Sequence, residues 1–173
     1  MHELLSHMAE VRFSKGELII SEGERNSNFY LLKKGIWRAY YLTDGTEHSL
    51  WFAAPGDTAF SSWGYVDGEV SPVNIESVNE SIAYCISKPE LEALFSHSID
   101  MANFGRRIFE REILSVDSST VAYGTPPTAK ERYMTLMVSG FLSLHHSAIP
   151  EPDTRRIKEK VKDLFMSRCK KGS

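Results

Sequence analysis

The 173-residue sequence has no long hydrophobic run and little cysteine. No stretch approaches the roughly 18 consecutive apolar residues of a membrane-spanning helix, so we expect no membrane segment. The first residues have neither the basic start nor the apolar core of a secretory signal. Cys85 and Cys169 stand alone, without a C-x-x-C pair, which excludes zinc fingers and favours reduced thiols. Together these absences predict a cytoplasmic protein.

Signatures of catalysis and of metal binding are also missing. His145 and His146 are adjacent, so they point apart on a helix or strand, and His48 lacks the His-x-His spacing of metal-binding β-barrels. The segment 61–64, Ser-Ser-Trp-Gly, lacks the glycine on each side of a serine that a nucleophile elbow needs. We therefore predict no enzyme activity, no metal and no cofactor. A cupin-type barrel enzyme is the alternative that a bound metal would favour.

Charge is distributed unevenly along the chain. Residues 1–124 carry 18 acidic against 10 basic side chains, a net charge of −8, whereas residues 125–173 carry 10 basic against 5 acidic, a net charge of +5. A basic segment on an acidic body favours an anionic partner, nucleic acid first. The alternative is a solvated helix face with a basic end.

Short β-strands dominate the first half of the chain. The β-branched and aromatic composition predicts strands over residues 17–21, 28–33, 35–42, 48–53 and 73–78. Asp44-Gly45 predicts a tight hairpin turn over 43–46, because this pair tolerates positive φ. Many short strands at regular spacing predict a sandwich or barrel.

Helical periodicity replaces this pattern after Ser87. We expect a short helix over 89–95 and a longer one from about 99 to 123, since apolar residues recur there at steps of three and four. A helix of about 25 residues spans about 37 Å, more than one barrel end requires, so we predict a homodimer seam. The alternative is that this stripe packs on its own barrel. The predicted seam residues are Met101, Phe104, Ile108, Phe109, Ile113 and Val116.

The last 50 residues predict two more helices. Gly124-Thr-Pro-Pro127 ends the long helix, and the capping box 128–131 begins a helix that reaches about residue 144. After a break at 150–152, residues 154–171 form a basic amphipathic pattern with an apolar stripe.

Five segments together carry a family resemblance: 15–24, 29–35, 55–57 (Pro-Gly-Asp), 81–87 and 128–133. Their order and spacing resemble the Crp/Fnr family of transcription regulators. The resemblance implies an α+β fold, with a β-roll of the cyclic-nucleotide-binding type over 1–98, a long dimerisation helix over 99–123 and a helical DNA-binding module over 124–173. It also implies a homodimer that senses a small molecule and binds DNA.

The phosphate-binding cassette departs from that family's pattern. The Gly-Glu pair that holds the ribose falls on Phe60-Ser61, and the Arg-Ser pair that holds the phosphate falls on Ser71-Pro72. Residues 55–78 contain no Lys or Arg, yet burying a phosphate requires a cation or several converging donors. We therefore predict an empty or repurposed pocket that does not bind cyclic AMP and senses an unknown effector or none. The ligand-pocket candidates are Phe60, Ser61, Ser62, Trp63, Ser71, Pro72 and Val73.

The C-terminal segment also departs from the pattern. A helix-turn-helix places a turn between two short helices, but no Gly or Pro occurs over 154–171, so we predict a truncated or degenerate reader. DNA binding would then be mainly electrostatic. The alternative function is a stand-alone sensor or protein-interaction domain that does not bind DNA. The candidate nucleic-acid contacts are Arg155, Arg156, Lys158, Lys162, Arg168, Lys170 and Lys171.

Overall fold

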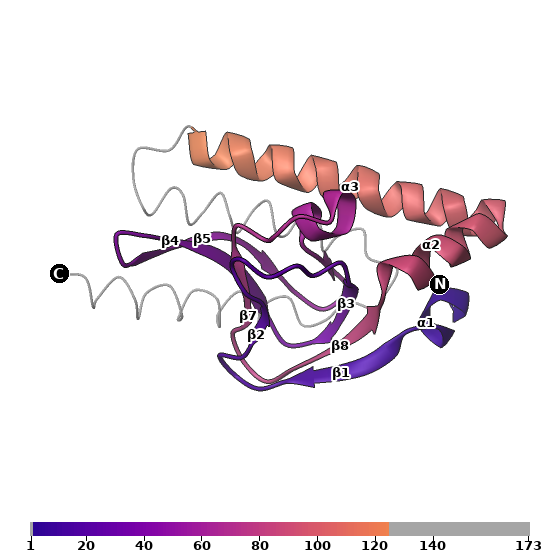
Figure 1. Ribbon diagram of the computed structural model, residues 1–173, viewed down its shortest axis with the longest axis horizontal. Helices are drawn as coiled ribbons and strands as arrows, with labels where there is room; N and C mark the ends of the chain where they lie inside the picture. Colours follow the sequence, from indigo (N-terminus) through magenta and orange to yellow (C-terminus); the bar gives the residue numbers. More distant parts are fainter. Residues whose placement is uncertain (1, 125–173) are drawn as a thin grey trace.

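The computed structural model describes residues 2–124, with side-chain burial for residues 3–114. Within this range an antiparallel β-roll is followed by two helices (Figure 1). The strands form two four-stranded sheets, in the orders β1-β8-β3-β6 and β2-β7-β4-β5. The elements are α1 His2–Ser6, β1 Ala9–Phe13, β2 Leu18–Ile20, β3 Phe29–Lys34, β4 Trp37–Thr43, β5 Thr46–Ala53, β6 Thr58–Ala59, the π-helix η1 Trp63–Asp67, β7 Asn74–Ser77, β8 Ser81–Ile86, α2 Lys88–His97 and α3 Ile99–Gly124. The predicted α+β fold is confirmed.

Aromatic rings fill the space between the two sheets. The rings of Phe13, Tyr30 and Trp37 meet edge to face, with centroids 5.4 to 6.5 Å apart. The Trp37 indole N–H donates to the Ser81 hydroxyl at 2.8 Å, so its one polar group is satisfied inside the core. Residues of both sheets pack around these rings, and the interior of the roll is therefore a packed hydrophobic core.

A second core lies between the sheet β1-β8-β3-β6 and the helices. Phe29 and Ile86 of this sheet pack with Leu91 of α2 and Met101 of α3. Helix α2 begins at a capping box, in which Ser87 and Glu90 hydrogen-bond each other's backbone N–H groups. This second core fixes α2 and the first half of α3 on one side of the roll.

The β4–β5 hairpin has the predicted tight turn. Asp44 and Gly45 have φ of 50° and 74°, and Thr43 pairs with Thr46 across the turn. Two consecutive positive φ angles are the conformation for which Asp-Gly is favoured. The hairpin extends well beyond the rest of its sheet (Figure 1).

Three elements of the structure differ from the sequence-based expectation. Strand β1 begins at Ala9 and pairs with β8, whereas the first strand was expected at residue 17. The two-residue strand β6 and the π-helix η1 were not predicted either. The predicted long helix is confirmed, and it ends one residue later, at Gly124. The helices expected over 129–144 and 154–171 lie outside the described residues.

Candidate ligand-binding cassette

The segment between β6 and β7, residues 60–73, occupies the position of the predicted ligand pocket and is called the cassette here. Its centre is the π-helix η1, which ends at Gly68 in the left-handed region (φ 69°). The Glu69 N–H donates to the Trp63 carbonyl at 3.1 Å and closes the turn. The cassette is therefore a folded unit with its own hydrogen bonds.

The loop between β2 and β3 fastens the far end of the cassette. The Gly23 N–H donates to the Ser71 carbonyl, and the Ser71 N–H donates to the Glu24 carbonyl, each at 2.8 Å. The Glu22 N–H donates to the side-chain oxygen of Asn74 at 2.8 Å. This two-way pairing fixes residue 71 relative to the roll.

Gly64 allows the same loop to approach the middle of the cassette. A Cβ atom at this position would lie 2.1 Å from the carbonyl oxygen of Asn26, a distance that no side chain tolerates. The backbone of η1 therefore lies directly against the loop, and only glycine permits this contact.

The hydroxyl groups of the two buried serines of the predicted pocket form hydrogen bonds with backbone groups of the cassette itself. The Ser61 hydroxyl accepts from the Gly64 N–H at 3.2 Å. The Ser71 hydroxyl donates to the Val73 carbonyl at 2.8 Å. Both side chains are buried, so their hydroxyls are engaged within the cassette.

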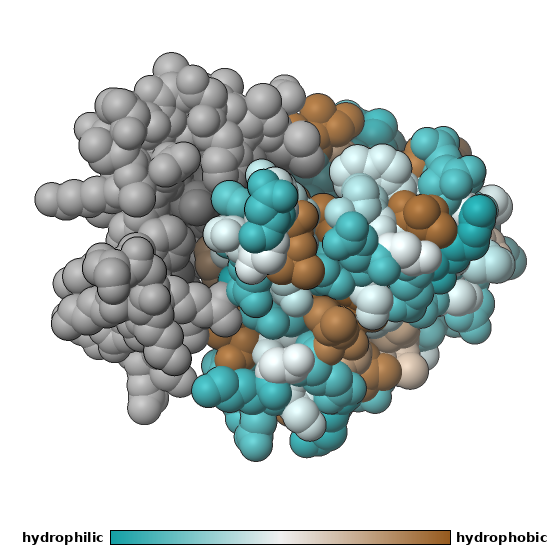
Figure 2. All heavy atoms as spheres, turned by 60° about the vertical axis from the view of Figure 1, so that its left-hand side comes forward, coloured by the Kyte–Doolittle hydropathy of each residue, from teal (hydrophilic) through white to brown (hydrophobic). Residues whose placement is uncertain are grey.

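The other predicted pocket residues separate into three groups. Ser62, Trp63 and Pro72 are exposed, and Val73 is half-buried. Phe60 lies in the core on the helix side, so it is placed apart from the interior of the roll. On the face seen in Figure 2, apolar side chains form separate patches bordered by hydrophilic ones. The structure thus brings Ser61 and Ser71 into one folded segment but distributes their neighbours over different surfaces.

Phe60 connects the cassette to the long helix. Its ring stacks on Phe29 at 5.5 Å and meets Phe109 of α3 edge-on at 5.8 Å. Tyr65 of η1 contacts both Phe60 and Phe109, at 5.4 and 5.5 Å. Burial raises the pKa of Tyr65 to about 12, so the phenol stays neutral. No sequence pattern marks Tyr65, because a five-residue π-helix shows no helical periodicity.

Two cations beside the cassette were also missed, because both lie outside residues 55–78. The guanidinium of Arg25 donates to the Gly68 carbonyl and lies 3.7 Å from the Glu69 carboxylate. The ammonium of Lys88 donates to the Val66 carbonyl at 3.4 Å. Both cations thus contact the outer end of η1 and are engaged by its own groups.

Helix α3 uses its apolar residues in two different ways. Met101 is only 4% exposed, and Phe104, Ile108 and Phe109 pack against the same helix-side core. The alternative that the stripe packs on its own body therefore describes the first half of the helix. Farther along, Ile113 is 62% exposed and Leu114 is 65% exposed. The side chain of Val116 lies outside the described range.

Helix α3 is hydrogen-bonded to the residue after the Pro-Gly-Asp turn, and a carboxyl group lies on each side of this junction. The Asp57 carboxylate accepts from the Ala54 N–H at 2.8 Å, and the Thr58 hydroxyl donates to the Glu112 carboxylate. Burial, and then the charge of Glu112, raise the pKa of Asp57 to about 6. Burial also raises the pKa of Glu112.

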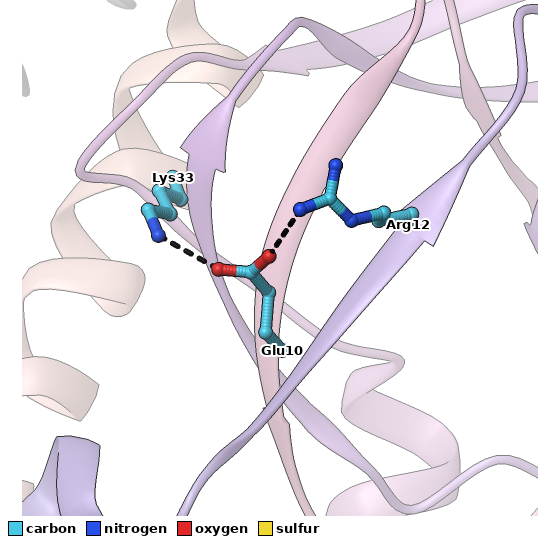
Figure 3. Close-up of polar contacts among 3 residues, drawn as sticks. All are labelled: Glu10, Arg12 and Lys33. Carbon is cyan, nitrogen blue, oxygen red and sulfur yellow. Dashed lines mark hydrogen bonds and ion pairs between the residues drawn. The ribbon is translucent and has the colours of Figure 1, made fainter.

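A shallow depression of about 260 Å³ lies outside the cassette, lined by residues that include Arg12, Lys34 and Glu80. Glu10 accepts from Arg12 at 2.8 Å and from Lys33 at 2.7 Å, as Figure 3 shows. The hydrogen bond from Lys33 is the main cause that lowers the pKa of Glu10. Exposed pairs of this kind add little stability, and the Arg12 cation is already paired, so we assign no ligand to the depression.

The residues between 2 and 124 contain no group of three or more His, Cys, Asp or Glu side chains placed to hold a metal ion. None of the helices in that part of the chain is long and apolar enough to cross a bilayer.

Comparison with known families supplies the deciding observation. The sequence pattern of the cyclic nucleotide-binding domain matches residues 10–98, just over half of the chain. The chain belongs to the cyclic nucleotide-binding domain family. The match begins within β1 and ends after α2, so this domain comprises the β-roll, the cassette and the short helix. A comparison with curated proteins finds no significant match.

Solved structures share the fold of this cyclic nucleotide-binding domain. FixK2 from Bradyrhizobium japonicum superposes with a TM-score of 0.63 at 23% identity, covering 76% of this chain and 64% of that one. A transcriptional regulator from Thermotoga maritima superposes with a TM-score of 0.57 at 17% identity, covering 67% of this chain and 92% of that one. The sensor domain of the transcriptional regulator DNR from Pseudomonas aeruginosa superposes with a TM-score of 0.51 at 23% identity, covering 63% of this chain and 77% of that one. The chain thus spans just under two thirds of FixK2, and the likeness is one of fold.

Proposed function

We propose that this protein is a homodimeric transcription regulator of the Crp/Fnr type whose β-roll responds to a signal other than cyclic AMP. Helix α3 carries that signal toward a basic C-terminal segment that contacts DNA. The fold shared with transcriptional regulators supports the proposal, as does the concentration of basic residues after residue 124.

The observation that carries the proposal is the aromatic contact between the cassette and α3. Phe60 and Tyr65 of the cassette both touch Phe109, and the helix continues for fifteen residues beyond it. Because packed side chains transmit displacement rather than absorb it, a change in the cassette moves Phe109. Ile113 and Leu114 lie one turn farther along, so such a movement reaches the surface that we assign to the dimer.

Three features of the cassette argue against a cyclic phosphate as the signal. Residues 55–78 lack Lys and Arg, and the hydroxyls of Ser61 and Ser71 are engaged by cassette backbone. The nearby cations of Arg25 and Lys88 are held by the cassette's own carbonyl groups. A buried phosphate would therefore lose its hydration without gaining charge-assisted partners.

The expected DNA contact is electrostatic. The basic residues of 154–171 would face phosphates, whereas seating a helix in the major groove requires a turn that the sequence does not show. Affinity should therefore fall steeply with salt and depend weakly on sequence.

Fluorescence anisotropy of a labelled random duplex, titrated with the full chain at several salt concentrations, tests this proposal. We expect binding at about 50 mM salt that weakens at least tenfold by about 200 mM. The variant Arg155→Gln/Arg156→Gln should bind more weakly and lower the salt slope by about one per lost contact. Its matched control, Arg106→Gln/Arg107→Gln, removes the same charge from an exposed part of α3 and should bind like the unmodified chain.

Two results would change the conclusion. If the chain did not bind DNA at low salt, the DNA-binding part would be wrong and the stand-alone sensor or interaction domain would replace it. If the chain bound one palindromic site at nanomolar affinity and ignored random duplex, a working helix-turn-helix would lie in the C-terminal segment.

A further inference from the structure

Helix α3 is joined to the β-roll by a polar contact that the aromatic core does not include. The Thr58 hydroxyl donates to the Glu112 carboxylate, across 54 residues of sequence. Asp57, next to Thr58, is fixed by its turn: its carboxylate accepts from the Ala54 N–H, and its carbonyl accepts from the Leu32 N–H at 2.9 Å. Asp57 therefore cannot leave its place beside Thr58 without giving up a backbone partner.

Each of the two carboxyl groups is half-buried, and the charge of Glu112 acts on Asp57. Burial and the charge of Glu112 both raise the pKa of Asp57, to about 6, far above its value in an unfolded chain. When both groups are ionised, their charges repel each other across the junction of α3 and the roll. When one of them holds a proton, that repulsion disappears and the hydrogen bond from Thr58 remains.

One nearby cation opposes the effect of burial on the pair. Among the described residues, Arg111 is the further charged group that acts on both carboxyl groups, lowering the pKa of each. Its residue is exposed, and the pKa of Asp57 is raised even with this cation present. Glu110 pairs with Arg106 along the same helix. The turn and the adjoining strand β3 contribute Pro55, Gly56, Thr58 and Leu32, none of which ionises.

We propose that Asp57 and Glu112 form a proton-sensitive latch on the Thr58–Glu112 contact, which holds α3 against the β-roll while one of the two carboxyl groups is protonated and loosens it when both are ionised. Glu112 directly precedes Ile113 and Leu114, so the latch acts on the helix where it leaves the body. The latch requires neither DNA nor an effector, so its test is independent of the proposed regulator function.

The direction of the pH effect follows from proton linkage. A carboxyl whose pKa is higher in the docked state than in the released state binds protons on docking, so docking weakens as the pH rises. The pKa of Asp57 is 3.8 in the released state and about 6 in the docked state, so most of the docking strength is lost between these two pH values. From about pH 5.0 to about pH 7.5 it amounts to roughly tenfold in the docking equilibrium.

Hydrogen exchange of the full chain, corrected for the intrinsic pH dependence of exchange, measures this docking. We expect protection of residues 105–114, relative to strands β3 and β8, to fall about tenfold between about pH 5.0 and about pH 7.5. Asp57→Asn and Glu112→Gln each keep one acceptor oxygen and remove one charge, so both should abolish most of that change. Glu110→Gln, the matched control on the same helix, should behave like the unmodified chain.

Equal protection at the two pH values would overturn the latch, as would a pH dependence retained in both Asp57→Asn and Glu112→Gln. If either variant also lost protection in β3 and β8, its fold would be damaged and Thr58→Val would decide. That variant removes the hydrogen bond without changing the charge, so we expect weaker protection of α3 at both pH values with the tenfold change preserved. Unchanged protection in Thr58→Val would contradict the proposal.

Discussion

Replacing Ile113 by glutamate should separate the proposed homodimer without unfolding the protomer. Ile113 is 62% exposed, so its side chain contributes little to the core of its own chain. Met101, on the same helix, is 4% exposed, and a charge there would disrupt the protomer itself. Only substitutions in the second half of α3 therefore report on association alone.

The expected magnitude follows from the exposed area. Burying the free part of one isoleucine side chain is worth about 1–2 kcal/mol, and a twofold interface contains each residue twice. Losing both copies weakens the dimer by about 2–4 kcal/mol, which corresponds to a dissociation constant about 30- to 1000-fold higher. The desolvation of two glutamates adds to this loss.

Sedimentation equilibrium measures the dissociation constant directly, and far-ultraviolet circular dichroism checks the fold. Ile99→Glu is the matched control, because Ile99 is 81% exposed but lies at the first residue of the same helix. We expect that variant to dimerise like the unmodified chain. An unchanged dissociation constant for Ile113→Glu, or an unmodified chain that is monomeric at tens of micromolar, would refute the reasoning.

Three further predictions concern stability. Gly64→Ala should lower the free energy of unfolding by at least about 2 kcal/mol, measured by urea denaturation against Ser62→Ala, because its Cβ would collide with the loop backbone. Arg38 is 2% exposed, and its guanidinium lies 2.7 Å from the Glu76 carboxylate. Arg38→Met should therefore lower the free energy of unfolding by about 3 kcal/mol, and adding Glu76→Gln should restore part of that loss. An absence of any restoration would contradict the pairing. The raised pKa of Asp57 should make the unmodified chain lose about 2 kcal/mol of stability from about pH 4 to about pH 7 relative to Asp57→Asn, and parallel pH profiles would exclude this.

Local sequence signals accounted for the regular parts of the fold. Asp44-Gly45 determined the hairpin turn because few pairs adopt two positive φ angles. The periodic apolar residues of α3 defined a helix whose observed bounds agree closely with the prediction. These features depend on neighbouring residues only, so they are readable without tertiary information.

Features that depend on distant partners were not readable in the same way. The burial of Arg38 depends on Glu76, which strand pairing brings beside it from a distant part of the chain. The apolar stripe of α3 likewise has one period throughout, although Phe109 packs on the body and Ile113 does not. Hydrophobic periodicity reports that a residue is apolar, and it does not report which surface covers it.

The ligand-pocket prediction had a comparable limit. Alignment by spacing placed Phe60 in the pocket, whereas the side-chain contacts place its ring beside Phe109. In strand β1, Glu10 and Arg12 alternate with Val11 and Phe13, so the local pattern is that of a strand although none was predicted there.

Isothermal titration calorimetry with cyclic AMP tests most directly the claim that this cyclic nucleotide-binding domain responds to a different signal. Each missing charge-assisted contact is worth about 1.5–3 kcal/mol, so two of them remove two or more decades of affinity. We predict no heat beyond dilution when the full chain is titrated to about 1 mM nucleotide. A low-micromolar dissociation constant with one site per chain would contradict the account.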